Sequence, residues 1–116
     1  MTISRNIWFA ALTLVPGLAL AHAHMEMSVP AANSTVASMP AQIMLHFSEA
    51  TKLTAVSVEK ADGSGKQELK AGTDAKAMFM IASPKLGAGV YVIKWRGLSD
   101  DSHVVNGTVK FTVSGK

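Results

Sequence analysis

Histidine and acidic side chains that could bind one metal together lie in three short segments of this 116-residue chain. Asp101 and His103 are two residues apart, so in an extended segment both point to one side and can converge on a single ion. His22 and His24 follow an apolar segment near the start of the chain, and Glu49 ends an apolar run. Imidazole nitrogen suits copper and zinc, and a carboxylate adds a harder oxygen donor. A single Asp-x-His pair is common in polar loops, so it is weak evidence for a metal site unless the other two segments also supply ligands.

Residues 1–21 have the three parts of a secretory signal peptide. Arg5 supplies the basic start, an apolar run follows, and small residues close the segment at Ala21 in an A-x-A pattern. A membrane anchor is the alternative, but the apolar run is short for a bilayer and Pro16 interrupts it. We therefore expect export, removal of residues 1–21, and one domain over residues 22–116.

Cleavage after Ala21 would make His22 the new N-terminus. Its α-amine and imidazole could then chelate one ion, and an α-amine with a pKa of about 7.7–8.0 loses its proton to a metal at little cost near neutral pH. Cu(II) binds such nitrogen donors more tightly than other first-row divalent ions do. His24 leaves two further arrangements open: a chelate through the amine, two backbone amides and its own imidazole, or cleavage two residues later that exposes His24 itself. A solvated terminus without metal is the remaining interpretation.

Glu49 and the methionines leave further alternatives open. Glu49 is a candidate as a weak direct ligand, as a partner of the ligands, or as an exposed charge at a strand end, whereas His46 is expected to be structural or solvent-facing. The methionines other than the initiator stand in pairs, namely Met25 and Met27, Met39 and Met44, and Met78 and Met80. Thioether sulfur is a soft ligand that suits Cu(I), but methionine is also an ordinary filler of protein cores.

Charge and cysteine content exclude several classes of function. Without Arg5, ten of the eleven lysines and arginines remain against eight acids, and the basic residues are scattered with no cluster that includes aromatics. This pattern is typical of a solvated surface and does not predict nucleic-acid binding. The chain has no cysteine, which excludes blue-copper thiolates, zinc ribbons, iron–sulfur clusters and thiol nucleophiles.

Apolar residues alternate with polar ones in several short segments separated by turn signals. The expected strands are residues 43–48, 53–58, 67–69, 77–81, 90–96 and 107–113, and Asp62 to Gly65 reads as a turn. Inward faces are expected to carry Ile43, Leu45 and Phe47; Tyr91, Ile93 and Trp95; and Val109, Phe111 and Val113. A period of two with turns about every ten residues predicts an antiparallel β-sandwich, with Trp95 in its core.

The chain resembles the CopC family, which includes the PcoC proteins. The matching segments are HAHMEMSVPA (residues 22–31), LHFSE (45–49), LGAGVYVIKWR (86–96), SDDSH (99–103) and GTVKFTV (107–113). Several motifs in the same order are far more specific than any one of them, and together they strengthen the interpretation of Asp101 and His103 as ligands.

The resemblance implies a seven-stranded Greek-key β-sandwich of cupredoxin- or immunoglobulin-like character. It implies a monomeric periplasmic protein that carries or buffers one Cu(II) per chain in copper resistance or supply, with an inner-membrane CopD-like importer as a partner. By this resemblance His22, Asp101 and His103 match the family's copper ligands, and Glu49 matches a glutamate that is a ligand in some members. No enzymatic activity is expected.

Two departures from the family and one rival function complete the interpretation. Some members carry a methionine- and histidine-rich loop that binds Cu(I), but residues 58–66 contain no methionine, which favours a Cu(II)-only type. Val104 follows His103 where proline is usual, which could loosen the loop.

A copper monooxygenase could use two histidines, yet the Asp101 carboxylate would fill a coordination position that oxygen chemistry needs open. A structural sandwich with incidental histidines is the third alternative.

Overall fold

The computed structural model describes residues 23–115. Over that range the chain forms β1 (Met25–Val29), β2 (Thr35–Val36), β3 (Gln42–Lys60), β4 (Gln67–Leu69), β5 (Lys76–Ala82), β6 (Gly89–Leu98) and β7 (Val104–Val113). Within these residues there is no helix of the length and apolarity needed to cross a membrane. The expected all-β fold with seven strands is confirmed.

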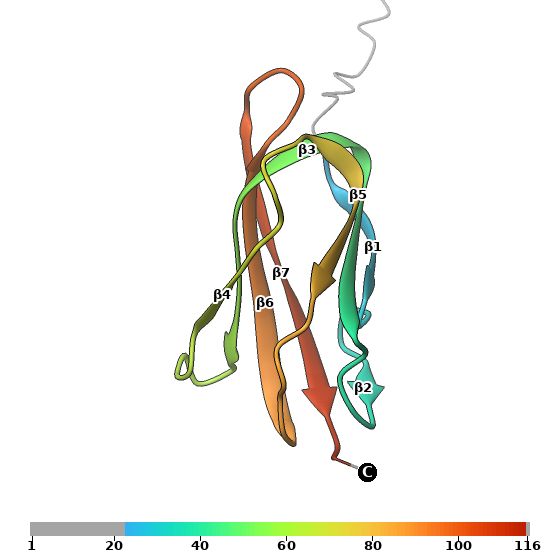
Figure 1. Cartoon of the computed structure of the whole chain (residues 1–116), viewed down its shortest axis with the longest axis vertical. Coiled ribbons are helices and arrows are strands. Elements are labelled where there is room, and N and C mark those ends of the chain that lie inside the picture. The colour runs from blue at the N-terminus through green and yellow to red at the C-terminus, as the bar shows by residue number, and fades with distance from the viewer. Residues whose placement is uncertain (1–22, 116) are drawn as a thin grey trace, which may run out of the picture.

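The strands form two layers that face each other (Figure 1). In the first, which we call sheet A, β3 lies between β1 and β5 and is antiparallel to both. In the second, sheet B, the order is β4, β3, β6, β7 and β2. Only the short β2 runs parallel to its neighbour β7, and the other pairs are antiparallel. Strand β3 therefore belongs to both sheets and joins them.

The long strand β3 corrects one expectation. Residues 43–48 and 53–58 were expected to be separate strands, but they belong to one continuous strand of 19 residues. It pairs with β5 as far as Thr51 and with β6 from Lys52 onward, with an irregular register before Thr51. No glycine or proline interrupts residues 42–60, so the backbone bends from one sheet to the other instead of ending. The side chain of Thr51, fully buried at the bend, donates a hydrogen bond to the Glu49 carbonyl at 3.0 Å.

The core lies between the two sheets and confirms the three expected inward faces. Its buried apolar residues are Ile43, Leu45, Phe47, Leu53, Val56, Val58, Phe79, Ile81, Tyr91, Ile93, Trp95, Val109, Phe111 and Val113. Phe47 of sheet A packs edge-on against Trp95 of sheet B, with ring centroids 4.9 Å apart, and also against Phe79 at 5.9 Å. Such aromatic pairs add to the burial of apolar area, so Phe47 connects the layers directly.

Trp95 is in the core, as expected, and a glycine in the neighbouring strand makes room for it. Gly107 lies opposite Trp95 in the β6–β7 ladder. A Cβ atom at Gly107 would come within 2.8 Å of the indole ring, which is closer than real contacts allow. Glycine in a strand often marks such a close approach. This packing fixes the end of β6, from which the next loop begins.

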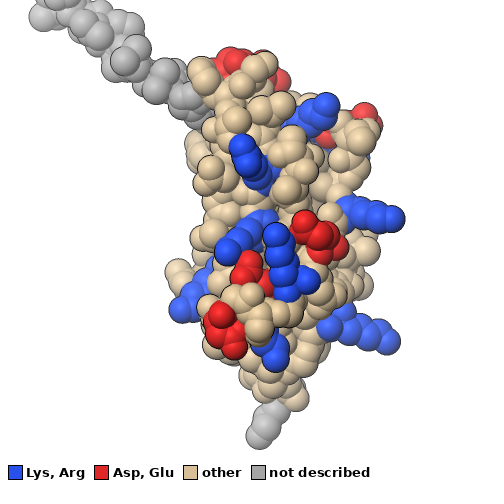
Figure 2. All heavy atoms as spheres, turned by 90° about the vertical axis from the view of Figure 1, so that its left-hand side faces the viewer, with Lys and Arg blue, Asp and Glu red and all other residues tan. Residues whose placement is uncertain are grey.

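Charged side chains of both signs share the outer surface on the side where β4 lies (Figure 2). Within sheet B, Lys94 of β6 and Glu59 of β3 form an ion pair, with the ammonium 3.0 Å from a carboxylate oxygen. Mixed charge of this kind agrees with a solvated surface and not with a nucleic-acid interface.

Three segments that carry candidate ligands meet at one end of the sandwich. The first described residues, the bend of β3 and the β6–β7 loop all lie at the end opposite the C-terminus (Figure 1). The fold therefore brings the N-terminal segment, Glu49 and the Asp101–His103 loop to a common end.

Candidate metal centre

A tight turn, and not the extended segment that the spacing suggested, positions Asp101 and His103. The five residues between β6 and β7 close on themselves, since the Ser99 N–H donates to the His103 carbonyl and the Ser102 N–H donates to the Ser99 carbonyl, both at 2.9 Å. Ser102 adopts a left-handed backbone with φ of 66°. The expectation of an extended loop was wrong, because these local hydrogen bonds favour a turn. The two side chains still converge.

The convergence of the two side chains is direct. The Nδ1 atom of His103 lies 2.7 Å from Oδ2 of Asp101, and both side chains remain about half exposed. Two ligand atoms that each lie about 2.0 Å from one ion, at a right angle, are about 2.8 Å apart. A metal could replace the shared proton at this separation once the imidazole turns so that the Nδ1 lone pair points to the ion and not to the carboxylate. Nitrogen and oxygen donors in neighbouring positions fit the tetragonal geometry of Cu(II).

Ser99 contacts both candidate ligands, and the sequence did not single it out. Its buried hydroxyl donates a hydrogen bond to Oδ1 of Asp101, which also accepts from the His103 N–H at 3.4 Å, whereas Oδ2 faces the His103 ring. The Ser99 bond, followed by smaller contributions from His103, lowers the pKa of Asp101 from 3.8 to about 2. The carboxylate is therefore ionised at every physiological pH. A serine two residues before the aspartate was the available signal, but serines are common in turns.

The start of the described chain is tied to the bend of β3. His24 donates its N–H to the Ser48 hydroxyl at 3.1 Å, and the Ser48 N–H donates to the His24 carbonyl at 2.8 Å. Ala23 is buried, whereas His24 is exposed. His22 lies outside the described residues, as do the expected signal peptide and cleavage site. The backbone that leads to His22 thus passes beside Ser48, next to Glu49.

Glu49 is half-buried at the bend but does not complete a metal site with the loop residues. Over residues 23–115, no three side chains of the types His, Cys, Asp or Glu come close enough together to hold a metal. The structure thus brings Asp101 and His103 together and leaves Glu49 apart from them. Within residues 23–115, Asp101 and His103 therefore have no third His, Cys, Asp or Glu beside them.

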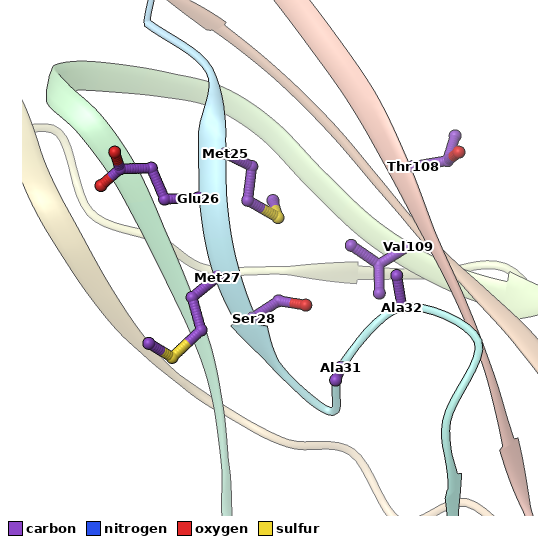
Figure 3. Close-up of a pocket in the computed structure, with 8 residues that line it drawn as sticks. All are labelled: Met25, Glu26, Met27, Ser28, Ala31, Ala32, Thr108 and Val109. Carbon is purple, nitrogen blue, oxygen red and sulfur yellow. The ribbon is translucent and has the colours of Figure 1, made fainter.

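An apolar hollow between β1 and β7 is not part of this site. It has a volume of about 350 Å³ and lies between β1 and β7 (Figure 3), lined by Met25, Glu26, Met27, Ser28, Ala31, Ala32, Thr108 and Val109. Glu26 is the only ionisable residue among them, and its side chain points to the other side of β1 from Met25 and Ser28 (Figure 3). The hollow offers no converging set of nitrogen and oxygen donors.

Comparisons with known proteins agree on one family. The model of the CopC domain matches residues 25–114. Copper resistance protein C of Pseudomonas syringae pv. tomato is 37% identical over 115 residues, covering 90% of each chain, and that of Escherichia coli is 36% identical over 106 residues, covering 82% of this chain and 83% of the relative. CopC from Methylosinus trichosporium OB3b superposes with a TM-score of 0.68 at 29% identity, covering 80% and 94%. PcoC from E. coli gives 0.57 at 35%, covering 81% and 100%.

These matches span nearly the whole described range, and the sequence comparisons and the structure comparisons point to the same family. The solved relatives cover the same β-sandwich that the described residues form. The curated relatives carry names that refer to copper resistance. The chain therefore belongs to the CopC family of copper resistance and copper transport proteins.

Proposed function

We propose that the exported chain carries one Cu(II) ion, held by the α-amine and imidazole of His22 together with Asp101 and His103. Glu49, at the same end of the sandwich, would hold a water or a neighbouring ligand, or bind weakly itself. The donors are nitrogens and oxygens, which suit Cu(II) better than Cu(I). The proposed set contains no sulfur donor.

The 2.7 Å contact between Asp101 Oδ2 and His103 Nδ1 is the observation that carries this proposal. It supplies two donor atoms already at the separation of neighbouring ligands, and the ionised carboxylate needs no deprotonation. The two hydrogen bonds between His24 and Ser48 hold the first described residues at the same end of the fold. A terminal chelate from His22 would complete a set that the described residues leave incomplete.

The proposed role is that of a periplasmic carrier or buffer that supplies an inner-membrane CopD-like importer. Export follows from the signal-like segment of residues 1–21. A relative named Copper transport protein CutJ, from Bacillus subtilis, is 29% identical over 121 residues, which cover 96% of this chain but only 22% of that protein. The presence of a similar segment within a much longer copper transport protein supports the proposal that this chain delivers copper to a transporter.

Substitution of His103 tests the proposed site. His103→Ala should leave the fold intact, because an exposed loop residue contributes little to the core. The Cu(II) EPR spectrum of mature protein should nevertheless change to one with more nitrogen donors and no carboxylate, as copper moves to an amine and amide chelate at His22 and His24. His46→Ala is the matched control and should leave the spectrum unchanged. An unaltered spectrum and affinity in His103→Ala would place the copper on the N-terminal tripeptide alone and overturn the proposal.

A further inference from the structure

Four methionines and one histidine occupy the outer face of sheet A. Met78 and Met80 of β5 are 49% and 53% exposed, whereas Phe79 between them is buried. The same alternation turns Met44 and His46 of β3 outward between the buried residues of that strand. On β1, Met27 is 55% exposed, and its side chain lies on the opposite side of the strand from Met25 and Ser28 (Figure 3). We call these five residues the methionine face: Met27, Met44, His46, Met78 and Met80.

The pairing register places these side chains next to one another. His46 lies directly opposite Met27 on one side and Met78 on the other, because β3 is the middle strand of the sheet. In the next row, Met44 lies directly opposite Met80. Directly opposite residues have Cβ atoms about 4.5–5.5 Å apart, and the two rows are about 6.8 Å apart along the strands. Methionine has three rotatable bonds, so several sulfurs can reach one point beside the imidazole.

Core packing does not account for these methionines. Met25 and Met39 are partly buried and packed against the core, which is the usual role of methionine as filler. The residues of the methionine face are instead half-exposed or exposed on the solvent side. An apolar docking surface would also need a partner to cover His46, and burying an imidazole without a hydrogen-bond partner is costly. A metal would use that imidazole as a ligand.

The donor atoms at the methionine face favour a soft metal ion. Thioether sulfur favours Cu(I), and imidazole also binds copper, whereas oxygen ligands are the choice of hard cations. The paired positions of the two rows, with Val29 completing the second, carry no carboxylate and no ammonium group; Glu26, the unpaired residue before Met27, places one carboxylate on the same side of β1 (Figure 3). We propose that the methionine face binds one Cu(I) ion through His46 and the sulfurs around it. This site goes beyond the proposed Cu(II) site and shares no residue with it.

The test is anaerobic Cu(I) competition with the double variant Met78→Leu/Met80→Leu. Leucine keeps the apolar character of the face and removes only the sulfurs. Cu(I) affinity should fall at least about 100-fold, since loss of two ligands should cost more than the 10–100-fold lost with an outer partner of a ligand. Met39→Leu is the matched control, because it removes a half-buried sulfur elsewhere, and its Cu(I) affinity should remain that of the wild type.

A second measurement keeps the proposal testable if the double variant folds poorly. Ag(I), a redox-inert substitute for Cu(I), should shift the NMR methyl signals of Met27, Met44, Met78 and Met80 in the wild-type protein and leave those of Met25 and Met39 in place. His103→Ala should bind Cu(I) as the wild type does, which separates this site from the Cu(II) site. Unchanged Cu(I) affinity in Met78→Leu/Met80→Leu, or Ag(I) shifts spread evenly over all methionines, would overturn the proposal.

Discussion

The β6–β7 loop and the methionine face gather ligands in different ways. In the loop, Asp101 and His103 are near neighbours in sequence, and a turn closed by Ser99 orients them. On the methionine face, three strands supply the donors, and only the antiparallel register brings Met27, His46 and Met78 into one row. The loop offers nitrogen and oxygen, whereas the face offers mainly sulfur. One small sandwich can thus present a hard and a soft site on separate elements.

This difference means that the two sites should respond separately to changes in the protein. Each loop ligand is held by a local hydrogen-bond network. Each ligand of the methionine face is held by a rigid strand, so a substitution in the loop or at the terminus should leave it undisturbed. Independence of this kind is expected for sites that share no residues and no partners.

The largest effect is expected from extra residues before His22. A Gly or Met added there removes the α-amine from the chelate, so Cu(II) affinity should fall by about 100-fold or more, beyond what loss of an outer partner costs. Cu(I) affinity at the methionine face should not change. Competition titrations of tagged and untagged mature protein, with the N-terminus verified by intact mass, measure both. Equal Cu(II) affinity in the two forms would show that the amine is not a ligand.

An intermediate effect is expected from Ser99→Ala, which removes the strongest influence on the Asp101 carboxyl. The pKa of Asp101 should rise from about 2 toward 3.8, as carboxyl carbon NMR shifts against pH would record. Because the folded-state pKa is depressed, its stabilising contribution is present above pH 3.8 and is lost as the pH falls toward 2. Cu(II) affinity should drop about tenfold at neutral pH, as for other outer partners of ligands.

The same variant should also change how acid releases Cu(II) from the β6–β7 loop. In the wild type, acid should release Cu(II) by protonating nitrogen donors while Asp101 is still ionised. In Ser99→Ala, protonation of Asp101 should add to the release below about pH 4, near the ordinary pKa of an aspartate. An Asp101 carboxyl that still titrates near pH 2 without the Ser99 hydroxyl would show that another group governs it.

The smallest effect is expected from Glu49→Gln. Glu49 stands at the common end of the fold but forms no three-residue group with Asp101 and His103. Cu(II) affinity should therefore decrease less than about tenfold, at the low end of what outer partners contribute. Isothermal titration of the mature protein with Cu(II) provides the measurement. A loss as large as that of His103→Ala would make Glu49 a direct ligand.

The sequence by itself determined the β-sandwich and the faces of its strands. Alternation with a period of two places Ile43, Leu45 and Phe47 on one side of a strand whatever that strand pairs with, so these core positions could be predicted. The pairing of Asp101 with His103 could be predicted for a similar reason, because two residues so close in sequence have few ways to be far apart. The bend of β3 was missed, since Glu49 is charged where the alternation calls for an apolar residue, yet the strand continues through it.

Only the tertiary structure decided the role of Ser99 and the existence of the methionine face. The absence of methionine from residues 58–66 argued against a Cu(I) site, but it concerned one loop and not the surface of a sheet. Whether Met27 lies beside His46, and His46 beside Met78, depends on the register of β1 and β5 against β3. That register is set by the packing of buried faces across the whole domain, because a slip of one residue would turn every apolar side chain to solvent.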